Sequence, residues 1–316
     1  MPFMRTLLVA AVSGVALSAC GGGSSGTANP PAGGAPSPTP TPTPVVTPTP
    51  TPTPSPDYNL ASDFTRDRSF NAIGVRLFVT AAPDGSSTVL DSSLDTERAA
   101  IGFDFSASTR TYRARYNSES LTAATELKSF MGYTYDRFEG PSSFLERSPS
   151  FAAASYVGYL DWRDYVGNLA TDPANRATLR LMLFGARTLA TDLPTTSSKT
   201  FTGLSSTFWS IPSEGRPATI SVDYAARTVS IETIYQPPAT GTAGSGGTAP
   251  SYPITMTGVF DPATGRISGT VNLDSAAANG SFEGALYGPR AAEAGIVFKG
   301  TGANRAYYYG FIIAKS

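Results

Sequence analysis

The sequence predicts a mainly β protein, in which an antiparallel barrel of about eight strands follows a smaller β-rich domain and a disordered, Pro/Thr-rich N-terminal linker. Three observations lead to this fold class. Short segments alternate apolar and polar residues, as in "ATISVDY", where Ile220, Val222 and Tyr224 share one face. Combinations of Asp, Gly and Pro separate these segments, and helical patterns are scarce. A large antiparallel sheet joined by short turns usually curls or closes, which hides its edge strands.

Residues 1–19 have the features of a bacterial lipoprotein signal peptide. Arg5 gives a positive start, and the apolar run "LLVAAVSGVALSA" is too short to span a bilayer. The following "LSAC" places Cys20, the only cysteine, directly after a small-residue cleavage site, as in a lipobox. The alternative is an ordinary signal peptide with an unrelated cysteine. We therefore predict that Cys20 is lipidated and anchors the chain to a lipid membrane.

Residues 20–57 form the predicted linker. Their Gly, Pro and Thr content cannot bury a core, and the Thr-Pro repeat favours an extended polyproline II conformation. At about 3.1 Å per residue, such a stalk could hold a domain on the order of 100 Å from the lipid. The phrase "GGGSSG" matches a dinucleotide-binding pattern, but it neither follows a strand nor opens a helix, so it does not indicate a cofactor.

Two folded domains are expected after the linker, over 58–150 and 151–316, with the loop "EGPSSFLERSPS" as their boundary. "SESLTAATELKSF" (118–130) is the one long helical candidate. The insertion "PPATGTAGSGGTAP" (237–250) is expected to join two barrel strands. Strands are expected near 70–80, 98–106 and 109–117 in the first domain, and near 153–162, 177–188, 199–208, 217–225, 228–235, 252–260, 266–273, 280–286, 295–300 and 305–314 in the second.

The stretch "GALYGPRAAEAGIVFKG" (284–300) interrupts the alternating pattern with a tight corner. Pro289 suits the first position of a helix and Gly295 the position after its end, so "PRAAEA" is expected to form a short helix. Tyr287 is expected to be buried beneath it, with its hydroxyl paired. Glu293 would lie in the last turn, where the helix dipole disfavours a carboxylate. We therefore expect a local partner, either backbone N–H groups or Arg290.

The pattern F-x-G-x-x-YGP-x-A-x-E-x-G-x-x-F over 282–298 resembles the closing motif of the barrel domain in transferrin-binding protein B-like surface lipoproteins of Gram-negative bacteria. The phrases "FGARTLATDLP" with "KTFTGL", and "VDYAARTVS", support the resemblance over about 156–316. Residues 58–150 are only loosely similar to the smaller "handle" domain of that family. The best-known members have two handle-plus-barrel lobes, and this chain has length for one. No ligand-contact residue can be carried over, because variable loops read the family's ligands.

The composition excludes several classes of site. The chain has no histidine, which removes Ser-His-Asp catalysis and His-ligated zinc, and a lone cysteine removes a thiolate metal site. Removal of Arg5 with the signal peptide would leave 22 basic and 24 acidic residues. A near-neutral balance without a basic cluster gives no electrostatic footprint for nucleic acid. We expect no cofactor, no metal site and no nucleic-acid partner.

Catalysis by carboxylates remains an alternative that needs no histidine. In "DWRDY" (161–165), we interpret Asp161 and Asp164 as sharing one face of a strand around Arg163. An exposed strand end with Asp–Arg pairing is the favoured interpretation. "TSSKT" (196–200) places a lysine near hydroxyls but lacks the Ser-x-x-Lys spacing. The run Tyr307–Tyr309 is expected to fill core and rim positions.

The expected function is a non-catalytic binding module on the outer-membrane surface. The resemblance implies a protein or iron-bearing ligand, an outer-membrane transporter that receives it, and an export translocon that displays the chain. A periplasm-facing structural envelope lipoprotein is the main alternative. A transmembrane barrel also alternates along its strands, but a lipidated, stalk-bearing chain has no need to insert one.

Overall fold

The structure is a computed structural model. It describes residues 58–81, 87–95, 101–124, 127–130, 133–140, 142–148, 151–166, 176–207, 215–235, 251–273, 276–301 and 307–316. The chain divides into the units Met1–Pro52 and Thr53–Ser316, and all described residues belong to the second. The signal peptide, Cys20, the linker and the 237–250 insertion lie outside the described residues.

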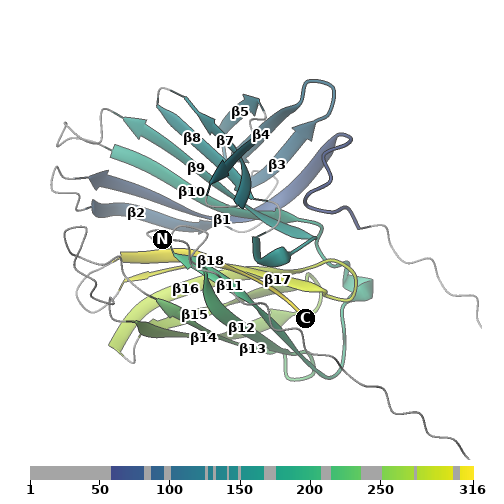
Figure 1. Ribbon diagram of the computed structural model, residues 1–316. Coiled ribbons are helices and arrows are strands. Elements are labelled where there is room, and N and C mark those ends of the chain that lie inside the picture. Colours follow the sequence, from purple (N-terminus) through teal and green to yellow (C-terminus); the bar gives the residue numbers. More distant parts are fainter. Residues whose placement is uncertain are drawn as a thin grey trace, which may run out of the picture. The chain divides into compact units, whose positions relative to one another are not determined.

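The first part of the chain forms a ten-stranded sheet (Figure 1). Its strand order is β5-β4-β3-β1-β10-β9-β8-β7-β6, and β2 also pairs with β1. The long strand β1 organises the sheet, because it pairs with β10 on one side and with β3 and then β2 on the other. The strands are β1 (Arg68–Ala81), β2 (Ser87–Asp95), β3 (Ile101–Ser106), β4 (Thr111–Tyr116), β5 (Glu119–Ala124), β6 (Leu127–Phe130), β7 (Tyr133–Glu139), β8 (Ser143–Ser148), β9 (Val157–Val166) and β10 (Arg176–Gly185).

The second part is a closed eight-stranded antiparallel barrel, in which β11 pairs with both β12 and β18. The strands are β11 (Ser198–Thr207), β12 (Arg216–Asp223), β13 (Thr228–Tyr235), β14 (Tyr252–Asp261), β15 (Arg266–Leu273), β16 (Ala276–Tyr287), β17 (Glu293–Thr301) and β18 (Tyr307–Lys315). The predicted fold class is therefore confirmed: a mainly β chain, with an eight-stranded barrel preceded by a further β-sheet.

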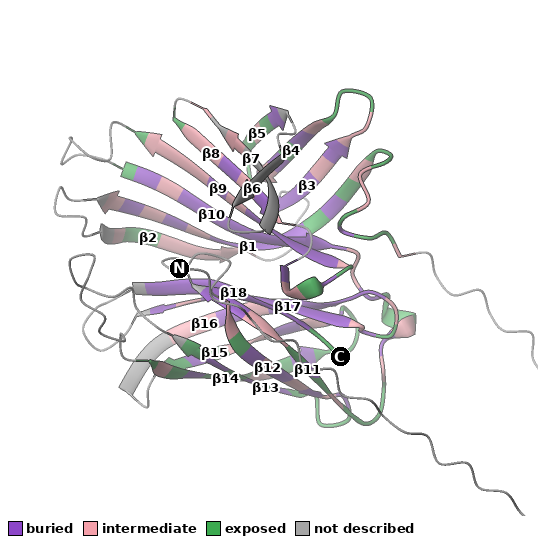
Figure 2. Cartoon of the chain, in the orientation of Figure 1, coloured by how far each residue is buried: buried purple, intermediate pink, exposed green. Residues whose placement is uncertain are grey.

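Alternating side chains fill the barrel. Phe201, Ile220, Met256, Ile296 and Phe298 are among the fully buried residues of its interior. The intervening positions are half-buried on β12 and largely exposed on β13 and β14, which produces the alternating colours in Figure 2. This apolar interior is what the sequence alternation predicted.

Short turns connect neighbouring strands at one end of the barrel. Asp223 accepts a hydrogen bond from the Ala226 N–H (2.8 Å), and Asp261 accepts one from the Ala263 N–H (2.9 Å). A bond from the Thr264 hydroxyl lowers the pKa of Asp261. Such bonds between an aspartate and the backbone two or three residues later stabilise tight turns.

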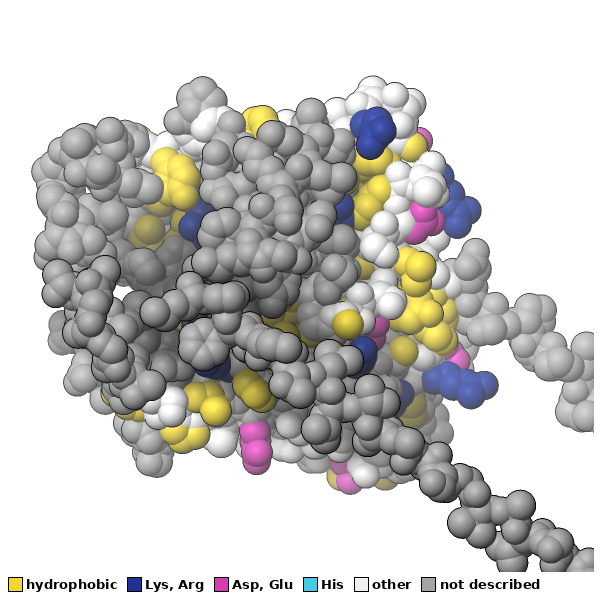
Figure 3. All heavy atoms as spheres, viewed as in Figure 1, with side chains coloured by type: hydrophobic (Ala, Val, Ile, Leu, Met, Phe, Trp, Pro, Cys, Tyr) yellow, Lys and Arg dark blue, Asp and Glu magenta, His cyan; other side chains and the backbone are white. Residues whose placement is uncertain are grey.

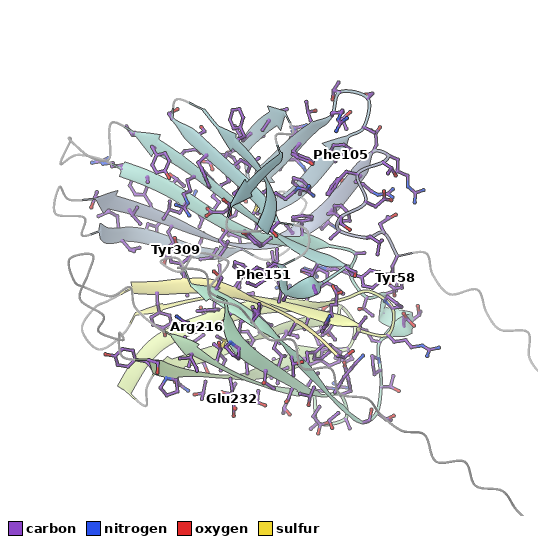
Figure 4. All side chains as sticks on the ribbon, viewed as in Figure 1. Tyr58, Phe105, Phe151, Arg216, Glu232 and Tyr309 are labelled. Carbon is purple, nitrogen blue, oxygen red and sulfur yellow. The ribbon has the colours of Figure 1, made fainter. Side chains whose placement is uncertain are left out.

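The ten-stranded sheet packs apolar side chains on both faces. One face forms an aromatic core that includes Phe103, Tyr116, Trp162 and Phe184. Arg147 lies inside this core, with its guanidinium carbon 3.9 Å from the centre of the Phe64 ring, and burial lowers its pKa to about 10. The other face packs on the outside of the barrel, and this cluster includes Leu77, Phe151, Leu181, Tyr287, Tyr309 and Phe311 (Figure 4).

Three predictions about local structure are wrong. The domain boundary at 150/151 is displaced, because β9 and β10 pair with β8 and β1 in the first sheet and the barrel begins at Ser198. Residues 118–130 contain the strands β5 and β6 in place of a helix, which agrees with their threonine content. No helix forms at the corner, where residues 288–291 make a turn between β16 and β17.

Candidate functional site

The corner, Tyr287 to Glu293, is a turn with an unusual backbone. Gly288 has φ +71°, and Arg290 and Ala291 have φ +52° and +53°. Two successive left-handed residues turn the chain in a way that a right-handed helix beginning at Pro289 cannot. A Cβ on Gly288 would lie 2.4 Å from Cδ2 of Tyr156, so a side chain is obstructed there.

Glu293 binds three successive backbone N–H groups at the start of β9. Its Oε1 accepts from the Ser155 N–H (2.6 Å), and its Oε2 accepts from Tyr156 (2.8 Å) and Val157 (3.0 Å). Burial raises the pKa of the Glu293 carboxyl, and the three hydrogen bonds oppose that rise. The predicted N–H partners are therefore confirmed, but they lie more than 130 residues away in the chain.

The corner also bonds to the segment between β10 and β11 and to Lys199 at the start of β11. The Gly288 N–H donates to the Ala186 carbonyl (2.8 Å), and the Thr188 hydroxyl donates to the Gly288 carbonyl (2.8 Å). The Arg290 N–H donates to Oδ2 of Asp192 (2.8 Å). The Lys199 ammonium donates to the carbonyls of Arg290 and Ala291, and burial lowers its pKa. These bonds fix the turn against the connection between sheet and barrel.

Tyr58, the first described residue, is held at the same corner. Its hydroxyl donates to Asp192 (2.9 Å) and accepts from the Leu189 N–H (3.1 Å), and its ring meets Tyr156 edge to face (Figure 4). Burial and the neighbouring Asp192 raise its pKa. The described part of the chain therefore begins beside the corner.

Tyr287 is 1% exposed and lies in the cluster between the sheet and the barrel, so its predicted burial is confirmed. Along β17, the outward side chains Glu293, Val297 and Lys299 all meet the first sheet. Val297 is fully buried in the same cluster, and the Lys299 ammonium donates to the Ser92 carbonyl and hydroxyl, each at 2.9 Å. A single barrel strand thus carries an apolar contact between two polar ones.

The strand registers define an opposite end of the first sheet. β9 starts at Val157 beside Glu293 and ends at Val166, which pairs with Arg176 at the start of β10. Arg176 in turn pairs with Thr80 near the end of β1. We call this opposite end the distal end.

Apolar side chains are exposed at the distal end. Val166 is 67% exposed and Leu90 is 52% exposed. Leu90 lies at the irregularity in the pairing of β1 with β2, next to Asp91, which pairs with Phe78. The guanidinium carbon of Arg176 lies 5.9 Å from the centre of the half-buried Phe78 ring. We define Phe78, Leu90, Val166 and Arg176 as the distal patch.

An ion-pair cluster lies close to the distal patch and joins β9 and β10 to β5. Arg180 is 2% exposed; it contacts Glu119 at 2.5 Å and Asp164 at 2.7 Å, and its guanidinium carbon is 4.0 Å from the centre of the Trp162 ring. A buried arginine needs such counter-charges. The cluster therefore holds β9 and β10 together next to the distal patch.

The carboxylate pair does not form. Asp161 and Asp164 are three residues apart and lie on opposite faces of β9, so the expectation of a shared face is wrong. Asp161 pairs with Arg163 at 2.5 Å, whereas Asp164 accepts from Arg180 and from the Trp162 ring N–H. The Asp–Arg pairing of the favoured interpretation is confirmed, but residues 161–165 are buried or half-buried, so the expected exposed strand end is wrong.

Two tyrosines of the run Tyr307–Tyr309 lie in the protein core. Tyr308 and Tyr309 are buried, as expected for core positions. No group of three His, Cys, Asp or Glu side chains in the described part of the chain could hold a metal ion. Within those same residues, no helix has the length and apolar character needed to cross a membrane. On the face shown in Figure 3, described acidic and basic side chains are interspersed.

Comparison with known proteins gives matches among solved structures. No protein-family model matches the chain, and no curated protein matches it in sequence. Solved structures of transferrin-binding protein B are among those that match the chain. One, from Haemophilus parasuis Hp5, is 13% identical with a TM-score of 0.38, over 78% of this chain and 44% of that one. The intact Ap-TbpB, with N and C lobes, is also 13% identical with a TM-score of 0.38, over 78% of this chain and 46% of that one.

A third structure, of the isotype 1 protein from serogroup B Neisseria meningitidis, is 12% identical with a TM-score of 0.30, over 79% of this chain and 77% of that one. The chain spans less than half the length of the Haemophilus parasuis and Ap-TbpB structures. These proteins belong to the family that the corner motif resembles.

Proposed function

We propose that this chain is a lipid-anchored surface module of the outer membrane that binds a protein or iron-bearing ligand at its distal end and delivers it to a membrane transporter. The observation that carries this proposal is the separation of two features. Tyr58, where the linker joins, is bonded at the corner. The exposed apolar distal patch lies at the other end of β9 and β10. A chain tethered at one end presents the other to an incoming partner.

The distal patch has the chemistry of a protein-binding surface. Aromatic side chains and arginine are enriched at protein interfaces, and arginine is also enriched among the few residues that supply most of the binding energy. Val166, Leu90 and Phe78 provide the apolar part, and Arg176 the charged part. Such a role requires no catalytic group, which agrees with a sequence that lacks histidine.

The anchoring prediction concerns Cys20. A Cys20→Ala chain should remain unprocessed and unacylated, because the cysteine thiol is the proposed site of lipid attachment. A single acyl chain gives only marginal membrane binding, whereas several hold a protein firmly. Detergent phase partitioning of cell extracts measures the difference: the wild-type chain should enter the detergent phase and the variant should not. Equal partitioning of both chains would contradict lipidation at this residue.

The binding prediction concerns Val166. Val166→Glu should abolish retention of the ligand, because a charge placed inside a desolvated apolar contact is strongly unfavourable. Val259→Glu is a matched control, since Val259 is a 59% exposed valine on the barrel strand β14. The proteins retained from host fluids by immobilised wild-type and variant chains would be compared. A species lost with Val166→Glu and kept with Val259→Glu supports the patch, and identical retention by all three chains would contradict it.

A further inference from the structure

We infer that the peptide N–H groups of Ser155, Tyr156 and Val157 form a preorganised carboxylate-binding site, and that the Glu293 side chain is the ligand by which the barrel occupies it. The inference goes beyond the proposed function, because it concerns a defined anion site between the first sheet and the barrel. The three donors converge on both carboxylate oxygens at 2.6 to 3.0 Å, and Glu293 is only 4% exposed.

The site is held in shape by bonds that do not involve Glu293. The Ser155 carbonyl accepts from the Ala61 N–H (2.8 Å), and the Tyr156 carbonyl accepts from the Ala186 N–H (2.9 Å). In a trans peptide the carbonyl and the next N–H point in opposite directions. These two bonds therefore aim the N–H groups of Tyr156 and Val157 towards the barrel. The backbone is set up to bind an anion before the anion arrives.

The residues just before the site support the same geometry. Ala152 and Ala153 both have positive φ, at +56° and +54°, and lead into Ser155 through the short turn Phe151–Ala153. Left-handed alanines are unfavourable in isolation, so the surrounding structure must hold them. On the barrel side, Lys315 pairs with Glu293 in the strand register and adds positive charge near the carboxylate.

Chemical rescue tests the site directly. Glu293→Ala removes atoms that correspond to acetate and leaves the three N–H donors in place. The variant should have a melting temperature lower than wild type by roughly 10 °C, since buried donors lose their acceptors in a chain of this size. Acetate should then recover at least half of this loss in a saturable manner, as a ligand that binds only the folded state does. Formate should act similarly, and neutral acetamide should have no effect.

The controls separate binding from general salt effects. All titrations would use the chain 21–316 at constant ionic strength, with chloride replacing acetate. Val297→Ala weakens the same interface without opening the anion site, so acetate should not rescue it. If Glu293→Ala does not fold in chloride, its refolding yield in acetate replaces the melting temperature. Equal responses of wild type, Val297→Ala and Glu293→Ala to acetate, or no response and no refolding of Glu293→Ala, would overturn the inference.

Discussion

Replacing Tyr287 with alanine is expected to destabilise the protein by about 3 to 5 kcal/mol, the usual cost of removing a large buried aromatic side chain. Tyr287 is 1% exposed and packs in the cluster that joins the sheet to the barrel. The cavity cannot collapse easily, because the neighbouring backbone is fixed by the Gly288 bond to Ala186 and by the isolated bridge between Arg187 and Tyr287.

Equilibrium urea denaturation of the chain 21–316 measures this effect. A fragment that begins at residue 151 is unsuitable, because β10 would lose its partner β1 and β9 would lose its partner β8. Tyr287→Phe is the matched control, since it keeps the ring and removes only the hydroxyl, and it should cost much less than the alanine variant. A loss below about 1 kcal/mol for Tyr287→Ala, typical of exposed substitutions, would show that the corner does not join sheet and barrel.

Gly288→Ala is expected to cost about 3 kcal/mol or more, because two unfavourable effects add. A residue with a Cβ loses about 1 to 2 kcal/mol in the left-handed conformation that Gly288 adopts at φ +71°. The new methyl group would also lie 2.4 and 2.7 Å from Cδ2 and Cγ of Tyr156, near the base of that ring. Moving the ring would disturb its contact with Tyr58.

Gly265→Ala separates the two effects. Gly265 has a similar φ of +68°, but its nearest neighbour would be Leu193 at 3.4 Å, an ordinary contact. The control should therefore lose only the conformational part. In a Tyr156→Ala background, Gly288→Ala should likewise lose only that part, and this double-mutant cycle isolates the steric contact. Equal losses for Gly288→Ala and Gly265→Ala in the wild-type chain would exclude a specific contact with Tyr156.

The barrel could be predicted from sequence because its information is local. Each of its strands pairs with the next in the chain, and only the pairing of β11 with β18 closes it. Alternation and turn residues therefore specified most of the architecture. The first sheet differs, since β1 pairs with β10 about a hundred residues later. Local patterns do not reveal such a pairing, so they predict β9 and β10 as barrel strands.

At the corner, the sequence revealed which residues matter but not their geometry. The tight turn and the burial of Tyr287 followed from local chemistry, whereas the partner expected for Glu293 was argued from the end of a helix that does not form. The prediction of a short helix is wrong because Arg290 and Ala291 adopt left-handed conformations. Tertiary hydrogen bonds, such as that from the Arg290 N–H to Asp192, hold the turn in place. The partners of Glu293 could not be found, since nothing near residue 155 marks an anion site in the sequence.

The distal patch had no recognisable sequence signal. Val166 and Leu90 are ordinary apolar residues near strand ends, and only the structure shows that they are exposed. Conversely, "DWRDY" suggested a carboxylate pair that strand alternation does not allow at a spacing of three residues. The exposure of a side chain depends on which strands pair around it. That information is distributed over the whole chain.

The central claim, a surface-displayed binding module whose distal end faces outward, is tested most directly by labelling intact cells. Cys20 is the only cysteine and its thiol is proposed to carry lipid, so Val166→Cys introduces one free thiol at a 67% exposed position. A membrane-impermeant maleimide should label Val166→Cys on intact cells as strongly as on cells with permeabilised outer membranes. Labelling that appears only after permeabilisation would contradict surface display and favour a periplasm-facing structural lipoprotein.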